Sequence, residues 1–131
     1  MIDPKVTDSR TPAATVLICE DEEPLRELIR VSLGGSHRFF EAKDGKTALK
    51  LAREHRPDIV VLDVMLPGIS GLEVLRAVRS DPELAGTRVV AISAWVHLEG
   101  EAVAAGADGF VGKPFDPQEL QSTVENLLPG P

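Results

Sequence analysis

Asp58-Ile-Val-Val-Leu-Asp63, near the middle of the 131-residue chain, has the sequence of a buried strand that ends in a carboxylate. Its four consecutive apolar residues are too few for a typical helix and lack polar alternation, which favours a strand covered on both faces of a parallel sheet. Turn residues follow from Pro67 onward. Asp63 should therefore lie at the carboxyl edge of the sheet, where ligands bind in open α/β folds. A lone aspartate at a strand end more often only caps a turn, so its role depends on the residues that accompany it.

Strand-like and helix-like segments alternate along the rest of the chain. The predicted strands are apolar or β-branched and end in polar groups, whereas the predicted helices carry apolar residues three and four positions apart. Strands are expected at 15–20, 38–42, 59–62, 88–93 and 110–113, and helices at 24–33, 46–54, 71–80, within 94–105, and at 117–128. Five strand–helix units predict an α/β fold, a doubly wound five-stranded parallel sheet with helices on both faces.

Length and composition predict one domain, 15–128, with a flexible lead-in at 1–14 and a tail or start of a linker at 129–131. No apolar run is long enough to cross a bilayer, and the start lacks the features of a secretory signal, so we expect a cytoplasmic protein without membrane contacts. The net charge of −7 argues against direct binding of nucleic acid by this domain. Cys19, the only cysteine, should pack as a small hydrophobe, and no zinc site is expected.

Chemically distinctive residues follow four of the predicted strands. Glu20 and Asp21 follow the first, Asp63 ends the third, Ser93 ends the fourth and Lys113 ends the fifth. Because the carboxyl ends of parallel strands meet at one edge of a sheet, these side chains can converge. Converging carboxylates raise one another's pKa unless a cation or a proton neutralises them, and oxygen-only ligands suit Mg²⁺. An aspartate beside Mg²⁺ and a lysine can act as a nucleophile toward a phosphoryl group.

Four segments together resemble the signature blocks of the receiver domain of bacterial two-component response regulators, of the chemotaxis-regulator-like kind. They are Glu20-Asp21, Asp63-Val-Met-Leu-Pro-Gly-Ile-Ser-Gly71, Ile92-Ser93-Ala94 and Gly106-Ala-Asp-Gly-Phe-Val-Gly-Lys-Pro-Phe115. The resemblance covers roughly 15–128 and implies the flavodoxin-like strand order 2-1-3-4-5. It implies a phosphorylation-dependent signalling domain that takes a phosphoryl group from a histidine kinase or a histidine phosphotransfer protein. The domain would then change conformation to control an output domain or partner, with no enzymatic activity beyond its own phosphorylation and dephosphorylation.

The resemblance assigns a role to each residue of the predicted metal site. Asp63 matches the phosphoacceptor, and Asp21 matches a direct ligand of Mg²⁺, to which Asp63 also binds. Glu20 matches the acidic neighbour that reaches the ion through water. Met65 matches the position whose backbone carbonyl completes the metal site. Without the other residues, the acidic cluster at 20–23 could be only a favourable helix N-terminus.

The resemblance also implies a switch. Ser93 matches the hydroxyl that binds the phosphoryl group on activation, and Lys113 matches the lysine that pairs with it. Phe110 matches the aromatic switch residue, although a core aromatic that never moves would have the same sequence. Pro114 matches a proline whose preceding peptide bond is usually cis and helps to aim the lysine. The span between the serine and the lysine is shorter than the family pattern, which predicts a short helix within 94–105.

The surface formed by this short helix, the fifth strand and the last helix is the expected site of partner contacts or of a homodimer. Met65 and Trp95 match positions that flank the phosphoryl group, and both are bulky and unable to orient water, so we expect slow hydrolysis of the aspartyl-phosphate. Alternatively, Trp95 points outward to a partner.

Three other classes of function remain to be weighed. A phosphohydrolase of the haloacid-dehalogenase type would carry an acid/base aspartate two residues after the nucleophile, where this chain has Met65. A receiver-like scaffold that only mediates contacts would commonly lack an acid or the lysine, which this chain retains. Nucleotide binding is disfavoured because no Gly-rich strand-to-helix loop is present.

Overall fold

The structure is a computed structural model that describes residues 14–128. Residues 1–13 of the predicted lead-in and the predicted tail at 129–131 lie outside the described residues. Ala14, the last residue assigned to the lead-in, is buried, and its carbonyl accepts a hydrogen bond from the backbone N–H of Arg38. None of the helices within 14–128 has the length and hydropathy needed to span a membrane.

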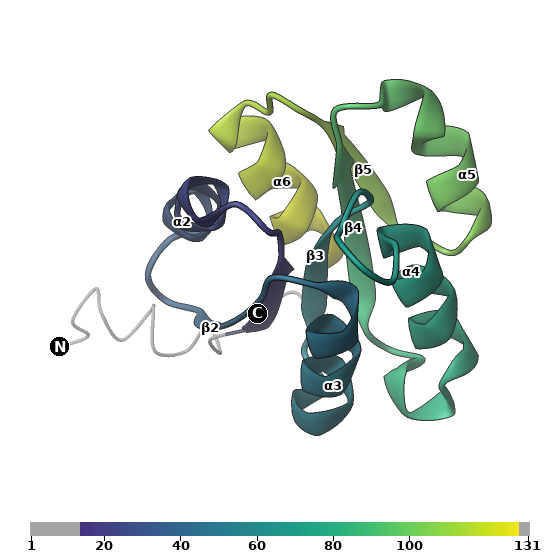
Figure 1. The fold of residues 1–131 in the computed structure, drawn as a ribbon. Coiled ribbons are helices and arrows are strands. Elements are labelled where there is room, and N and C mark those ends of the chain that lie inside the picture. Colours follow the sequence, from purple (N-terminus) through teal and green to yellow (C-terminus); the bar gives the residue numbers. More distant parts are fainter. Residues whose placement is uncertain (1–13, 129–131) are drawn as a thin grey trace, which may run out of the picture.

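The strands form one parallel sheet in the order β2-β1-β3-β4-β5, as the resemblance implied (Figure 1). Their bounds are β1 Thr15–Cys19, β2 Arg38–Ala42, β3 Ile59–Asp63, β4 Arg88–Ser93 and β5 Gly109–Gly112. The central strand β3 is buried along its whole length, because β1 and β4 pair with its edges and helices cover both of its faces. This arrangement confirms the interpretation of its continuous apolar run.

The helices cover the sheet in two layers. Within the described part of the chain they are α2 Glu23–Leu33, α3 Gly45–His55, α4 Gly71–Ser80, α5 Glu99–Ala104 and α6 Pro117–Leu127, with short 3-10 turns η1 Pro82–Leu84 and η2 Val96–Leu98. Helices α2 and α6 pack on one face, and α3, α4 and α5 pack on the other (Figure 1). Alternate side chains of β1 and β3 enter the two cores, since Ile18 and Val61 face α2 and α6 whereas Leu17 and Val60 face α3 and α4.

The connection from β3 to α4 is held tightly. A capping box begins α4, with the Ser70 side chain accepting from the Glu73 backbone and the Glu73 side chain accepting from the Ser70 backbone. The backbone N–H of Gly71 donates to the carbonyl of Val64 at 2.9 Å. A Cβ at Gly71 would lie 2.3 Å from the carbonyl oxygen of Asp63, so only glycine permits this close approach. The start of α4 is therefore fastened directly behind the end of β3.

Helix α5 has six residues, which confirms the predicted short helix. It buries only Ala102, and Val103 on its outer face is 54% exposed. Because so little apolar area anchors α5, we expect it to open more readily than the longer α2. Hydrogen exchange should show faster exchange from His97 to Ala105 than along α2, and equal protection of the two segments would contradict this prediction.

Candidate functional site

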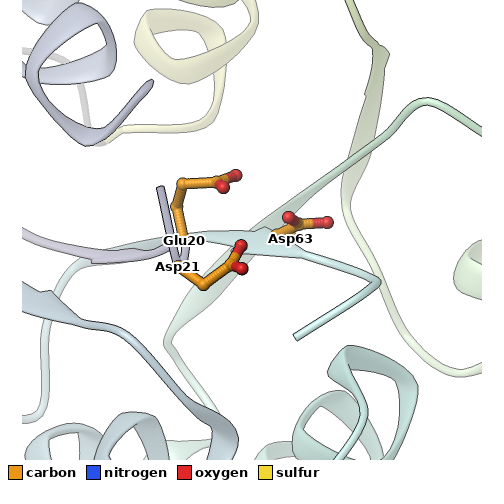
Figure 2. A group of neighbouring side chains, drawn as sticks. All are labelled: Glu20, Asp21 and Asp63. Carbon is orange, nitrogen blue, oxygen red and sulfur yellow. The ribbon is translucent and has the colours of Figure 1, made fainter. Parts of the chain in front are cut away.

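Three carboxyl groups gather at the carboxyl edge of the sheet, where β1 and β3 end (Figure 2). One carboxylate oxygen from each of Glu20, Asp21 and Asp63 lies within 4.8 Å of the others. Glu20 and Asp63 are buried, with 0% and 3% of their surface exposed, whereas Asp21 is exposed. The structure therefore brings together the acidic residues that the sequence placed at the ends of separate strands.

Lys113 joins this acidic cluster from β5. Its Nζ donates to Glu20 Oε1 at 2.9 Å and to Asp63 Oδ2 at 3.0 Å. Its backbone N–H donates to the carbonyl of Ser93 at 2.8 Å, which continues the pairing of β4 with β5 beyond the strands. The lysine thus connects the first, third and fifth strands at one point.

Burial and charge shift the protonation of these groups. Burial raises the pKa of Glu20 above its usual range, and nearby Asp63 raises it further, while the hydrogen bond from Lys113 opposes both effects. Burial alone would lower the pKa of Lys113, but its contacts with the two carboxylates outweigh this and raise the pKa. Three carboxylates against one ammonium leave an excess of negative charge that a cation would relieve. The all-oxygen donor set, partly open at Asp21, fits Mg²⁺, which keeps several waters.

Backbone N–H groups fix the orientation of Asp63 and Ser93. The backbone N–H of Met65 donates to Asp63 Oδ1 at 2.9 Å, so that both carboxylate oxygens have a donor. The Ser93 side chain is buried, and its Oγ accepts from the backbone N–H of Trp95 at 2.9 Å. Because Oγ acts there as an acceptor, its own hydrogen remains available for donation.

The remaining predicted residues lie around this centre. Phe110 is half-buried and packs against the small core cluster beneath α5. The peptide bond between Lys113 and Pro114 is cis, as expected. The side chains of Met65 and Trp95 are 55% and 53% exposed, and Trp95 makes an edge contact with the His97 ring. The structure thus places both bulky residues at the surface, with their backbones touching the site.

One residue of the site was not predicted from the sequence. Arg26 of α2 is buried, and its Nη1 donates to the backbone carbonyl of Glu20 at 2.8 Å. Its Nε bonds Glu41 of β2 at 3.0 Å. Arginine is usually exposed, so helical periodicity gave no reason to place Arg26 inside. The only signal was Glu41, an acidic residue among the apolar residues of the second strand after Arg38.

Comparisons with known proteins agree with this geometry. The profile of the family "Response regulator receiver domain" matches residues 16–125. The chain is 33% identical over 117 residues to the polar-differentiation response regulator DivK of Brucella anthropi, covering 87% of this chain and 95% of DivK. It is 39% identical over 119 residues to the transcriptional regulatory protein AfsQ1 of Streptomyces coelicolor, covering 87% of this chain and 51% of AfsQ1.

Several relatives are much longer than this chain. It spans 8% of histidine kinase P4 of Formosa agariphila and about half of the transcriptional regulators it matches, AfsQ1 among them. Among solved structures, a putative response regulator from Chloroflexus aurantiacus superposes with a TM-score of 0.83 at 30% identity, covering 88% of this chain and 97% of that one. The chemotaxis response regulator CheY4 of Vibrio cholerae gives 0.82 at 29% identity, covering 88% and 99%.

The family model, the shared strand order and the acidic cluster lead to one assignment. Receiver domains bind Mg²⁺ through acidic residues and interact with histidine kinases and output domains. This chain belongs to the response regulator receiver domains, the phosphoacceptor signalling domains of two-component systems.

Proposed function

We propose that Asp63 is the phosphoacceptor of this receiver domain and that a histidine kinase or a histidine phosphotransfer protein is the donor. The observation that carries the proposal is the position of the Asp63 carboxylate at the end of β3, where it lies beside Glu20 and Asp21 and accepts from the Lys113 Nζ at 3.0 Å. Glu20 also has Lys113 on one oxygen and a backbone N–H, that of Glu22, on the other, but of the three carboxylates only Asp63 is the last residue of the central strand β3.

The acidic cluster would hold Mg²⁺ through Asp21 and Asp63 directly, through Glu20 by way of water, and through the backbone carbonyl of Met65. When bound, the ion would neutralise the negative charge of the cluster and of the incoming phosphoryl oxygens. The fit rests on the clustered carboxylates and on the burial of two of them.

Phosphoryl transfer needs an in-line attack by a carboxylate oxygen of Asp63 on phosphorus. The new P–O bond forms as the P–N bond to the donor histidine breaks, and the leaving imidazole takes up a proton. The Lys113 Nζ would then pair with a phosphoryl oxygen while keeping its contact with Glu20. The Ser93 hydroxyl would donate to another phosphoryl oxygen, which favours the conformation where these groups are closest to the phosphoryl group. Phe110, packed beneath α5, would move with this change.

The proposed role is signalling without turnover of other substrates, since Met65 stands where a hydrolase would need an acid/base group. DivK, matched over 95% of its length, and AfsQ1, matched over 51%, represent relatives without and with a large additional region. An output domain or partner would contact the surface made by α5, β5 and α6, or a second copy would bind there as a homodimer. We place this signalling in the cytoplasm.

Incubation with acetyl phosphate and Mg²⁺ tests the proposal. Mass spectrometry should detect the gain of one phosphoryl group, and peptide mapping after borohydride trapping should place it on Asp63. Chelation of Mg²⁺ should prevent the gain. Absence of any gain in the presence of Mg²⁺, or modification at another residue, would contradict the assignment.

Asp21→Asn should weaken Mg²⁺ binding by about tenfold or more, because removing one charged oxygen ligand from a small cluster weakens its attraction for a hard cation. Calorimetric titration of the variant and of wild type measures the change. Glu83→Gln serves as the matched control, since this exposed carboxylate lies on η1 outside the acidic cluster. Equal Mg²⁺ affinities of Asp21→Asn and wild type would remove Asp21 from the ligand set.

The double variant Met65→Asn with Trp95→Glu should shorten the lifetime of the phosphorylated protein. The backbone N–H groups of Met65 and Trp95 donate to Asp63 and Ser93, so both side chains begin next to the site. The replacement side chains, unlike the native ones, can orient an attacking water. Decay of phosphorylated protein after donor removal gives the rate. Val103→Glu is the control, because Val103 is an exposed apolar residue on α5. If the phosphorylated double variant decays as slowly as phosphorylated wild type, Met65 and Trp95 do not slow the hydrolysis.

A further inference from the structure

The metal-binding residue Asp21 lies between two residues that are both hydrogen-bonded to Arg26. On one side, the carbonyl of Glu20 accepts from the Arg26 Nη1 at 2.8 Å. On the other side, the carbonyl of Glu22 accepts from the backbone N–H of Arg26 at 3.0 Å. The bond to Glu22 is an ordinary backbone bond of the first turn of α2, so only the bond to Glu20 depends on the arginine side chain.

The side-chain contact fixes one peptide plane. The backbone N–H of Glu20 donates to the carbonyl of Ala42 at 3.0 Å, which extends the pairing of β1 with β2. Its carbonyl, on the next peptide unit, has the guanidinium as its buried donor. That carbonyl belongs to the peptide bond that leads into Asp21, so its direction sets where the Asp21 carboxylate can point. Without the donor, a buried carbonyl would be left unpaired, which favours rotation of the peptide toward solvent.

Arg26 is itself held in place by charge. Its Nε bonds Glu41 Oε1 at 3.0 Å, and the other oxygen of Glu41 pairs with Nη1 of Arg30, one turn further along α2. The planar guanidinium therefore bridges β1, α2 and β2 with a fixed orientation. Arg30 shares Glu41 but makes no hydrogen bond or ion pair with the Glu20–Glu22 segment, and its side chain is 38% exposed. The two arginines share Glu41, but only Arg26 is buried and touches the Glu20–Glu22 segment.

We propose that Arg26 is a positioning residue for Mg²⁺: it fixes the peptide between Glu20 and Asp21 so that Asp21 is aimed at the site before the ion arrives. This inference rests on the proposed function of the acidic cluster. Mg²⁺ demands nearly ideal octahedral geometry, whereas Ca²⁺ accepts looser and more variable arrangements. Loss of positioning therefore weakens Mg²⁺ binding more than Ca²⁺ binding.

The test is calorimetric titration of wild type, Arg26→Met and Arg30→Met with Mg²⁺ and separately with Ca²⁺, at a temperature where thermal melts show all three folded. Arg26→Met should weaken Mg²⁺ binding by about tenfold, the size expected for losing a partner that orients a ligand. Arg30→Met should stay within about twofold of wild type, because it removes only a partly exposed ion pair that does not touch the Glu20–Glu22 segment. The ratio of Mg²⁺ to Ca²⁺ affinity should fall in Arg26→Met alone.

Each other outcome has a definite meaning. Equal Mg²⁺ affinities of Arg26→Met and Arg30→Met would overturn the inference, and so would equal losses for both ions in Arg26→Met, which indicate a general structural role. If Arg26→Met does not fold, Arg26→Lys decides, since one ammonium cannot reproduce the two-sided contact with Glu20 and Glu41. A lysine variant with wild-type affinity and ion preference would then overturn the proposal. If wild type itself binds no Mg²⁺, the proposed metal site fails as well, which distinguishes the two failures.

Discussion

Asp63→Asn should accept no phosphoryl group from acetyl phosphate under conditions where wild type gains one. An amide oxygen is a far weaker nucleophile than a carboxylate oxygen. Glu20 also accepts from Lys113, but it follows β1 and does not end the central strand β3, so it should not replace Asp63. The fold should remain, because asparagine has nearly the same shape and its oxygen can still accept from the backbone N–H of Met65. Intact-mass measurement over time, with circular dichroism for the fold, gives both results.

Two controls make this experiment specific. Asp81→Asn changes a carboxylate outside the acidic cluster and should take up phosphate as wild type does. Asp21→Asn should retain some uptake at high Mg²⁺ concentration, because its role is to bind the ion rather than to attack phosphorus. Stoichiometric uptake by Asp63→Asn would show that another residue is the phosphoacceptor.

Gly71→Ala should lower the free energy of unfolding of the domain by about 1–3 kcal/mol, the usual cost of adding a methyl group to a tightly packed site. The added Cβ would lie 2.3 Å from the carbonyl oxygen of Asp63 and 2.6 Å from Cα of Val64. Both are backbone atoms, so relief requires β3 and α4 to separate rather than a side chain to rotate. Separation would displace Asp63, the proposed phosphoacceptor, and phosphoryl uptake should slow as well.

Gly100→Ala is the matched control with the opposite expected sign. A Cβ at Gly100 meets nothing within 4 Å, and alanine inside a helix is favoured over glycine by about 0.5–1 kcal/mol. Thermal melts of the two variants beside wild type should therefore move in opposite directions. A Gly71→Ala protein that melts with wild type would mean that the close contact relaxes at little cost.

Most of the fold was predictable because the chain repeats one simple pattern. The apolar run at Ile59 to Leu62 is buried on both faces, and the polar residues after the strands meet at one edge because parallel strands share a direction. The sequence was a poorer guide to which side chains of a helix face the core. In α2, Leu28 lies three positions after Leu25 and so has the spacing of an inward-facing residue, yet it is 39% exposed, whereas Arg26 is buried. Periodicity defines a stripe only to within the width of a side chain, and neighbouring elements decide its limits.

The details that tune the site depend on tertiary contacts. The bond from Arg26 to the Glu20 carbonyl joins a helix to a loop, and the contact of Gly71 with Asp63 depends on how α4 approaches β3. Neither has a pattern in the local sequence. The clustering of Asp21 and Lys113 with Asp63 was predictable only because several strand ends carried distinctive residues at once.

The bond between Lys113 and Glu20 joins residues 93 positions apart, so its consequence is kinetic as well as chemical. Contacts of such long sequence separation form late in folding, because closing a long loop costs chain entropy before the contact can stabilise the fold. During synthesis, the strands that supply the three carboxylates emerge well before β5 supplies the ammonium that partly balances them. A nascent or partly folded chain therefore has carboxylates but no complete acceptor. If Asp63 and Lys113 act as proposed, phosphoryl uptake would therefore require the complete domain.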